Sequence, residues 1–203
     1  MSARTRIWLL VASIVLFAAI AWQVRSNGPL VGFDMQLQEL LQAHRTTPIV
    51  TLAEWATLMG GLYFIAAVSI LCTFFLVRRA AWRPLAGYWI CMIGAGASTL
   101  VLKELVYRPR PPSLDGAVVA SSSFPSGNSI LSAALFGATA FLVLPLLLRH
   151  KWLRIAVALA IIAPLLVAAS RVILSVHYLS DTIAGLSVGL AWAVIASLVV
   201  PRA

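Results

Sequence analysis

Six long runs of apolar residues dominate this 203-residue chain and limit what it can fold into. About 20 residues of helix cross a bilayer's hydrocarbon core, and each run is close to that length. The runs occupy approximately residues 7–23, 49–77, 84–102, 129–148, 155–175 and 182–200. Only 10% of the residues are charged, against about 25% in soluble domains. The sequence therefore predicts an all-α polytopic membrane protein, a bundle of six transmembrane helices forming a single domain over residues 1–203.

Two of the runs have more than one interpretation. The run 49–77 is longer than one span, so its helix either tilts or begins outside the membrane. The run 7–23 follows Arg4 and Arg6 and contains Ala19-Ile20-Ala21, as a signal peptide would. Its apolar core is long for a signal peptide, and we predict an uncleaved first helix.

The basic residues predict the orientation of the bundle. With six spans, one side of the membrane receives Arg4, Arg6, Arg78, Arg79, Arg83, Arg149, Lys151, Arg154 and Arg202. Basic residues in short loops mark the cytoplasmic side, so both termini are predicted to be cytoplasmic, in a bacterial inner membrane. This bias explains the net charge of +9. Because no basic stripe is interleaved with aromatic residues, we do not expect a nucleic-acid partner.

The segment 34–45 differs from the spans because polar residues alternate with Met35, Leu37, Leu40 and Leu41. This pattern predicts a short amphipathic helix along the outer membrane interface, started or capped by Asp34. We interpret it as a connector that shields the bundle rather than as a catalytic element.

Three short motifs place polar residues at the outer ends of the predicted spans. They lie at 103–111, 124–129 and 170–181. Polar and ionisable residues near a membrane are costly and usually functional. Lys103, Arg110 and Arg171 could neutralise a phosphoryl group, since guanidinium groups bind its oxygens in pairs. The three motifs are therefore predicted to converge on one phosphate-binding pocket facing the cell exterior.

Two of these motifs supply further groups for phosphate chemistry. Ser126 and Gly127 precede the fourth span, and free backbone N–H groups at a helix N-terminus form an anion site. His177 has a ring nitrogen suited to attack on phosphorus. Asp181 follows one helical turn later and could hold the other ring N–H. Cys72 and Cys91 have no metal-ligand spacing and are predicted to be packing residues.

The ordered motifs K-x6-RP, PSG and SR-x5-H-x3-D resemble those of the type 2 phosphatidic acid phosphatase superfamily, which includes acid phosphatases and vanadium haloperoxidases. The resemblance implies phosphate hydrolysis without metal or cofactor. His177 would form a phosphohistidine, and Asp181 would orient it. The phosphoryl oxygens would be held by Lys103, Arg110, Ser126, Gly127 and Arg171.

The resemblance also implies the substrate class, a membrane phospholipid or isoprenoid phosphate. Phosphatidylglycerophosphate, phosphatidate and undecaprenyl diphosphate fit it. Two alternatives remain open. A lipid or sugar acceptor could replace water, which would make the protein a phosphotransferase. A noncatalytic lipid-phosphate binding protein or transporter could retain the same anion pocket.

Position 128 departs from the family pattern, in which PSG is followed by a histidine that protonates the leaving oxygen. Asn128 stands there, and an amide donates a hydrogen bond but transfers no proton at a useful pKa. One interpretation is an engineered His→Asn change that suppresses turnover, which the intact remaining motifs favour. The other is a natural enzyme for diphosphates, whose leaving phosphate is already a stabilised anion.

Overall fold

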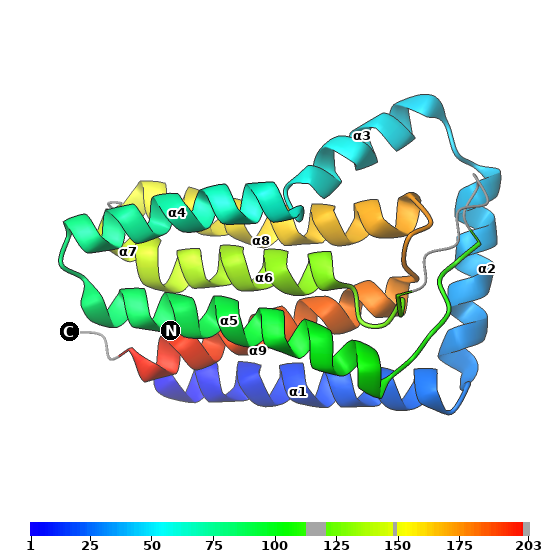
Figure 1. Cartoon of the computed structure of the whole chain (residues 1–203), viewed down its shortest axis with the longest axis horizontal. Helices are drawn as coiled ribbons and strands as arrows, with labels where there is room; N and C mark the ends of the chain where they lie inside the picture. Colours follow the sequence, from blue (N-terminus) through cyan, green and yellow to red (C-terminus); the bar gives the residue numbers. More distant parts are fainter. Residues whose placement is uncertain (113–120, 148–149, 201–203) are drawn as a thin grey trace.

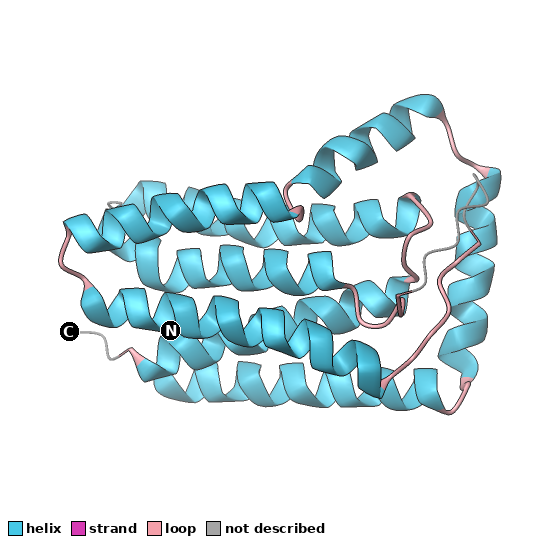
Figure 2. Ribbon diagram, viewed as in Figure 1, coloured by secondary structure: helices cyan, strands magenta, loops and turns pink. Residues whose placement is uncertain are grey.

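The computed structural model describes residues 1–112, 121–147 and 150–200, which form helices and loops with no strand (Figure 2). The helices, in chain order, are α1 Ala3–Arg25, α2 Pro29–Ala43, α3 Thr47–Leu58, α4 Leu62–Arg78, α5 Trp82–Leu105, α6 Gly127–Ala138, the π-helix η1 Thr139–Val143, α7 Leu144–Leu147, α8 His150–Ile173 and α9 Leu179–Val199. The all-α prediction is confirmed.

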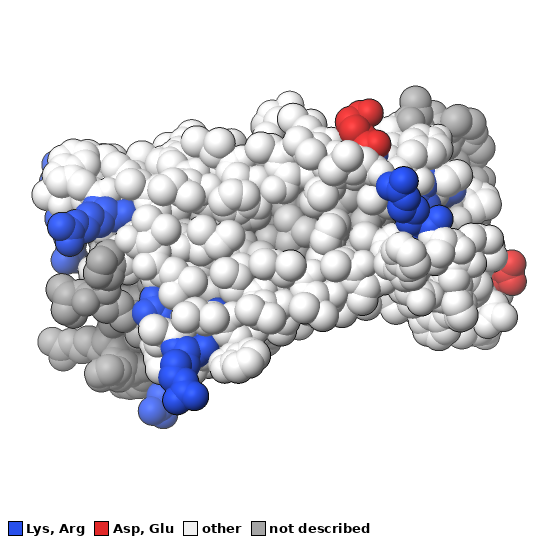
Figure 3. Space-filling model, turned by 90° about the horizontal axis from the view of Figure 1, so that it is seen from below, with Lys and Arg blue, Asp and Glu red and all other residues white. Residues whose placement is uncertain are grey.

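The membrane-spanning character of the bundle is also confirmed. Within the described ranges, five helical stretches are long and apolar enough to cross a membrane, and the bent pair α3–α4 makes a sixth if it counts as one span. The five long stretches and α4 run side by side, while α3 leans away from them (Figure 1). The visible face in Figure 3 has Lys, Arg, Asp and Glu only toward its two ends, with an uncharged band between them. Such a band suits contact with hydrocarbon.

The second apolar run is not one straight helix. It forms α3 and α4, which are bent by 40° at the residues between them. There the N–H groups of Gly60 and Gly61 donate to carbonyls three residues earlier, which tightens the chain into a turn. A Cβ on Gly60 would lie 2.5 Å from a methyl group of Val167 in α8. The glycine therefore lets this turn pack closely on the bundle.

The amphipathic helix exists, but its predicted start is wrong. α2 begins at Pro29, after the N-cap Gly28, since proline suits the first position of a helix. Asp34 is therefore neither a cap nor a starting residue. It lies in the second turn and is 1% exposed. Figure 1 shows α2 crossing one end of the bundle, roughly at right angles to the long helices.

Close packing of α6 against α9 brings the predicted site together. A Cβ on Gly185 would lie 2.6 Å from the Ser126 carbonyl oxygen, and one on Gly189 would lie 2.3 Å from the Ile130 carbonyl oxygen. Small residues four positions apart allow two membrane helices to approach this closely. As a result, the N-termini of α6 and α9 lie next to each other.

Enlarging Gly189 should therefore separate the two helices. We expect Gly189→Ala to lower the free energy of unfolding by about 1–3 kcal/mol, because the added methyl group forces a backbone shift. Thermal unfolding in detergent measures the effect. Gly96→Ala is the control, because a Cβ on Gly96 of α5 meets nothing within 4 Å. Equal melting temperatures for the two variants would contradict the argument.

Candidate active site

Three segments far apart in sequence meet at the end of the bundle that α2 crosses (Figure 1). They are residues 103–112, 121–129 and 170–181. Backbone hydrogen bonds join them. Ser123 N–H donates to the Arg108 carbonyl at 2.8 Å, and Ser126 N–H donates to the Asp181 carbonyl at 3.0 Å. The three polar motifs of the sequence are therefore in contact with one another.

His177 lies in the short loop between α8 and α9 and is 3% exposed. Its backbone N–H donates to the Arg171 carbonyl at 3.2 Å, which ties the loop to the end of α8. Ring Nδ1 lies 2.7 Å from the Ser123 carbonyl oxygen. Because a carbonyl only accepts, Nδ1 carries the proton and Nε2 presents a lone pair. The loop thus holds the imidazole in the tautomer that a nucleophile at Nε2 requires.

Asp181 lies beside His177 but does not accept a hydrogen bond from its ring. The distance from Asp181 Oδ2 to Nδ1 is 3.7 Å, longer than a hydrogen bond. Oδ1 accepts instead from Arg108 at 2.7 Å. Oδ2 accepts from the Tyr178 backbone N–H at 2.9 Å and from the Ser123 hydroxyl. Asp181 therefore acts on the ring through its charge, while the Ser123 carbonyl makes the hydrogen bond.

The surroundings of His177 keep its ring neutral. Burial lowers the pKa of His177 from 6.5 to about 4, with the Asp181 carboxylate opposing this shift and the Arg110 and Arg171 cations adding to it. The lone pair on Nε2 is therefore available at physiological pH. The influence of both arginines on the ring also places their charges close to it.

Arg110 is the cation nearest the reactive side of the ring. Its Nη1 lies 3.4 Å from His177 Nε2. The guanidinium also donates to the Val176 carbonyl at 3.0 Å and to the Ser121 hydroxyl at 3.0 Å. Burial lowers the pKa of Arg110, and the Asp181 carboxylate opposes this shift. Arginine side chains keep their charge in proteins. A permanent positive charge thus lies beside the Nε2 lone pair.

Lys103 and Arg171 complete the group of cations. Lys103 donates to the Ser122 carbonyl, and it interacts electrostatically with both Arg110 and Arg171. Arg171 donates to the Thr57 hydroxyl of α3 at 2.9 Å. Among the residues that the structure describes, no carboxylate lies within 4.0 Å of the charged nitrogens of these three side chains. We call Lys103, Arg110 and Arg171 the cation group.

The N-terminus of α6 lies at the same place. Ser126 is the N-cap, Gly127 is the first helical residue, and Ser126 is fully buried. The Ser126 hydroxyl accepts from the Ser129 hydroxyl at 3.1 Å. The first N–H groups of a helix have no acceptor within it, so they can bind an anion. The sequence predicted this arrangement of Ser126 and Gly127.

Asn128 occupies the first turn of α6, facing the bend between α3 and α4. A Cβ on Gly60 would lie 3.2 Å from the Asn128 Cβ. The side chain is partly buried, and within the described residues it makes no hydrogen bond. It thus lies one residue from the predicted anion site, where the family pattern has its histidine.

Sequence reasoning missed Arg108 and Asp34. Arg108 was not among the predicted site residues, yet it is 6% exposed and bound to two carboxylates. It donates to Asp34 at 2.8 Å and to Asp181 at 2.7 Å. The sequence offered one signal for this pairing. A charged residue that becomes buried needs a partner of opposite charge. Their separation of 74 positions hides the pairing.

The structure is thus a helical membrane bundle with a buried histidine, a carboxylate and a cation group at one end. The sequence pattern of the PAP2 superfamily matches residues 84–203, more than half of the chain. The chain belongs to the PAP2 superfamily.

Individual relatives agree with this assignment. The chain is 38% identical over 93 residues to phosphatidylglycerophosphatase B of Bacillus subtilis (strain 168), a match that covers 44% of this chain and 45% of that relative. It therefore spans less than half of the curated relative's length.

Two solved structures share the fold. The first transmembrane PAP2 type phosphatidylglycerolphosphate phosphatase from Bacillus subtilis aligns with a TM-score of 0.82 at 24% identity, over 93% of this chain and 94% of that one. Aquifex aeolicus LpxE aligns with a TM-score of 0.61 at 17% identity, over 79% and 92% of the two chains.

The neutral, single-tautomer state of His177 can be observed directly. We expect its ring, labelled with 15N in detergent, to stay in the Nδ1–H form as the pH falls through 6.5 and to gain a proton only near pH 4. Because folding lowers this pKa, the stability that the neutral ring contributes is present above pH 6.5 and is lost as pH falls through 4. His177→Gln identifies the signal. Titration near 6.5 would contradict the buried environment.

Proposed function

We propose that this chain is a membrane lipid phosphatase that cleaves a phosphomonoester or diphosphate through a phosphohistidine on His177. The observation that carries the proposal is the position of Nε2. Its lone pair lies 3.4 Å from Arg110 Nη1, within a cation group that has no carboxylate partner among the described residues. A nucleophile beside a group of positive charges suits an anionic phosphoryl group. Membership of the PAP2 superfamily supports the same chemistry.

The first step would form a nitrogen–phosphorus bond. The Nε2 lone pair of His177 would attack phosphorus, and the bond from phosphorus to the leaving oxygen would break with its electron pair going to that oxygen. Nδ1 would keep its proton and its hydrogen bond to the Ser123 carbonyl. Asp181 would stabilise the positive charge that forms on the ring. Lys103, Arg110 and Arg171, the Ser126 hydroxyl and the Gly127 N–H would hold the phosphoryl oxygens.

The second step would release phosphate. Water would attack phosphorus, the nitrogen–phosphorus bond would break, and its electron pair would return to Nε2. Phosphate would leave, and His177 would be neutral again. Charge stabilisation and positioning supply most of the rate in phosphoryl transfer, so this route needs no metal.

Asn128 weakens the first step for simple esters. An alkoxide is a poor leaving group and needs a proton, which an amide cannot transfer. A diphosphate instead expels a phosphate anion that is stable without protonation. Asn128 therefore favours diphosphate lipids for the chain as it stands, or little turnover of any lipid.

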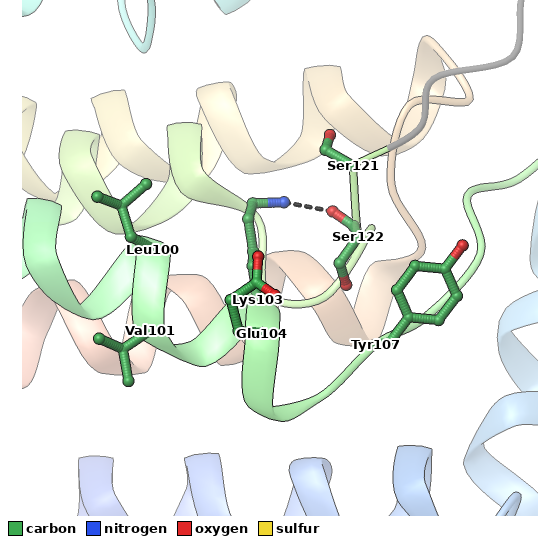
Figure 4. A pocket seen from close by; sticks show the side chains of 7 residues that line it. All are labelled: Leu100, Val101, Lys103, Glu104, Tyr107, Ser121 and Ser122. Atoms are coloured by element: carbon green, nitrogen blue, oxygen red, sulfur yellow. Dashed lines mark hydrogen bonds between the residues drawn. The ribbon is translucent and has the colours of Figure 1, made fainter.

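A pocket beside the site supports a lipid substrate (Figure 4). It has a volume of about 600 Å³ and is lined by Leu100, Val101, Lys103, Glu104, Tyr107, Ser121 and Ser122. Lys103 points toward Ser122, to which it donates. Leu100 and Val101, on the preceding turn of α5, are exposed on the bundle surface. A charged wall next to an apolar one suits a phosphate group attached to acyl or isoprenoid chains. Phosphatidylglycerophosphate, phosphatidate and undecaprenyl diphosphate all have this character.

The arrangement of the helices and the basic loops together support one orientation in the membrane. α1 begins and α9 ends at the bundle end opposite α2 (Figure 1). The basic loops of the sequence make that opposite end cytoplasmic. The active site would then face the periplasm or cell exterior in a bacterial inner membrane.

Asn128 also favours a second candidate, a noncatalytic lipid-phosphate binding protein. The cation group would bind the phosphate, and the lack of a proton donor would leave it uncleaved. A phosphohistidine on His177 would exclude this candidate.

Placing a histidine at position 128 should raise the turnover of esters. We expect Asn128→His to raise phosphate release from phosphatidate and phosphatidylglycerophosphate by about 10²–10⁴-fold, the usual contribution of a general acid. The gain on undecaprenyl diphosphate should be smaller, since its leaving group needs less protonation. Inorganic phosphate release in detergent micelles measures both.

Asn128→Gln is the control, because it changes the side chain without adding a proton donor. Equally low rates for the Asn128→His and Asn128→Gln variants on every lipid would contradict the role assigned to position 128.

The phosphohistidine can be trapped. The Asn128→His protein, mixed with a lipid labelled with 32P on its terminal phosphate and quenched within one turnover, should carry label that is lost in acid and kept in base. His177→Gln should carry none. Label that persists in the His177→Gln protein would mean that another residue is the nucleophile.

A further inference from the structure

α2 presents a row of polar side chains to the inside of the molecule. Asp34, Gln38 and Gln42 are spaced by four residues and share one helical face, and Arg45 follows just after the helix. Asp34 is 1% exposed and Gln38 is 3% exposed. We call these four residues the α2 row. A helix that only shielded the bundle would bury apolar side chains here instead.

Three members of the α2 row converge on the loop that carries His177. Gln38 donates to the Ser175 hydroxyl, as do Gln42 at 3.1 Å and Arg45 at 2.7 Å. Ser175 has a backbone φ of 52°, a left-handed conformation that is unusual for serine. Two residues later the chain reaches His177. The α2 row therefore holds the turn that aims the imidazole.

The fourth member, Asp34, holds the start of α9. It accepts from the Ser180 backbone N–H at 3.1 Å and from the Ser180 hydroxyl. It also accepts from Arg108 at 2.8 Å, and Arg108 in turn donates to Asp181 at 2.7 Å. The guanidinium carbon of Arg108 lies 4.1 Å from the centre of the Tyr178 ring, so the ring covers one face of the guanidinium group. Asp34 thus fixes Arg108, and Arg108 fixes Asp181.

We infer that the α2 row is the positioning element of the active site, acting on Asp181 through Arg108 and on His177 through Ser175. Asp34 and Arg108 are positioning residues that set the place of Asp181, and Gln38, Gln42 and Arg45 set the place of His177. This inference rests on the proposed function for its effect on turnover. Its effect on the His177 ring is independent of turnover.

Charge explains why both partners are needed. Two buried carboxylates share one guanidinium, so the removal of Arg108 leaves Asp34 and Asp181 uncompensated and favours protonation of one of them. Neutralising Asp34 instead removes one of the two carboxylates that hold the Arg108 guanidinium in place. In either case Asp181 loses its defined place beside the ring.

Kinetics in the Asn128→His background test the inference. We expect Asp34→Asn and Arg108→Gln to lower kcat on phosphatidate by about 10- to 100-fold, as misplaced supporting groups do. KM should change little, because neither residue belongs to the cation group. Glu39→Gln is the matched control. It removes the same charge from the same helix at an exposed position, and kcat should remain that of the parent.

The 15N spectrum of the His177 ring tests positioning separately, because a loss of stability alone would not change the tautomer of a folded protein. In the parent the ring should show the Nδ1–H tautomer only. In folded Asp34→Asn and Arg108→Gln protein a displaced Asp181 no longer holds the Ser123 hydroxyl, so the Ser123 carbonyl loses its fixed place at Nδ1. The ring should then show both tautomers, while Glu39→Gln should match the parent. Thermal unfolding in detergent establishes which variants are folded. If the Asp34→Asn and Arg108→Gln proteins are unfolded, the same spectrum is recorded for Ser180→Ala. This variant removes only one hydroxyl from the same hydrogen-bond network.

The outcomes separate the two proposals. Parental kcat and a single tautomer in the folded variants would overturn the positioning role. If neither the chain as it stands nor its Asn128→His variant released phosphate from any lipid, the proposed function would fail, and the tautomer spectra alone would decide on the α2 row. Mixed tautomers would then support positioning, and an unchanged spectrum would overturn it.

Discussion

The carboxylate of Asp181 is fully buried, and the site is arranged around the hydrogen bonds that it must receive. A buried charge without partners costs several kcal/mol. Arg108, the Tyr178 backbone and the Ser123 hydroxyl each supply a donor, and each comes from a different segment of the site. Satisfying this one group therefore joins the loop after α5, the loop before α6 and the start of α9.

Helix packing makes this convergence possible. Gly185 and Gly189 let α9 approach the backbone of α6, so that Ser126 reaches the Asp181 carbonyl at 3.0 Å. In a membrane, where lipid is as apolar as leucine, such close backbone contact is a main source of helix association. The same contact that stabilises the bundle thus sets the anion site at the N-terminus of α6 beside the carboxylate of α9.

Local patterns in the sequence predicted the spans and the three motifs, because hydropathy and helical spacing are read from neighbouring residues. The bend at Gly60 was not predicted, and the close approach of Gly60 to Val167 joins residues more than 100 positions apart, which a local pattern does not reveal. The Ser123 carbonyl was missed because it belongs to the backbone, and residue identity does not reveal it. Asp34 was misplaced because its role depends on Arg108.

The segment Arg108-Pro109-Arg110-Pro111 shows how neighbouring residues acquire opposite roles. A residue before proline is pushed toward extended backbone, and this applies to both arginines. In a straight extended chain, side chains two residues apart point to the same side. Contacts that bend the chain between Arg108 and Arg110 can turn their side chains apart. Here Ser123 N–H holds the Arg108 carbonyl, while the Arg110 guanidinium reaches the Val176 carbonyl and the Ser121 hydroxyl. Arg108 is consequently neutralised by Asp34 and Asp181. Among the described residues, Arg110 has only neutral hydrogen-bond partners beside His177, which leaves its charge available for an anion.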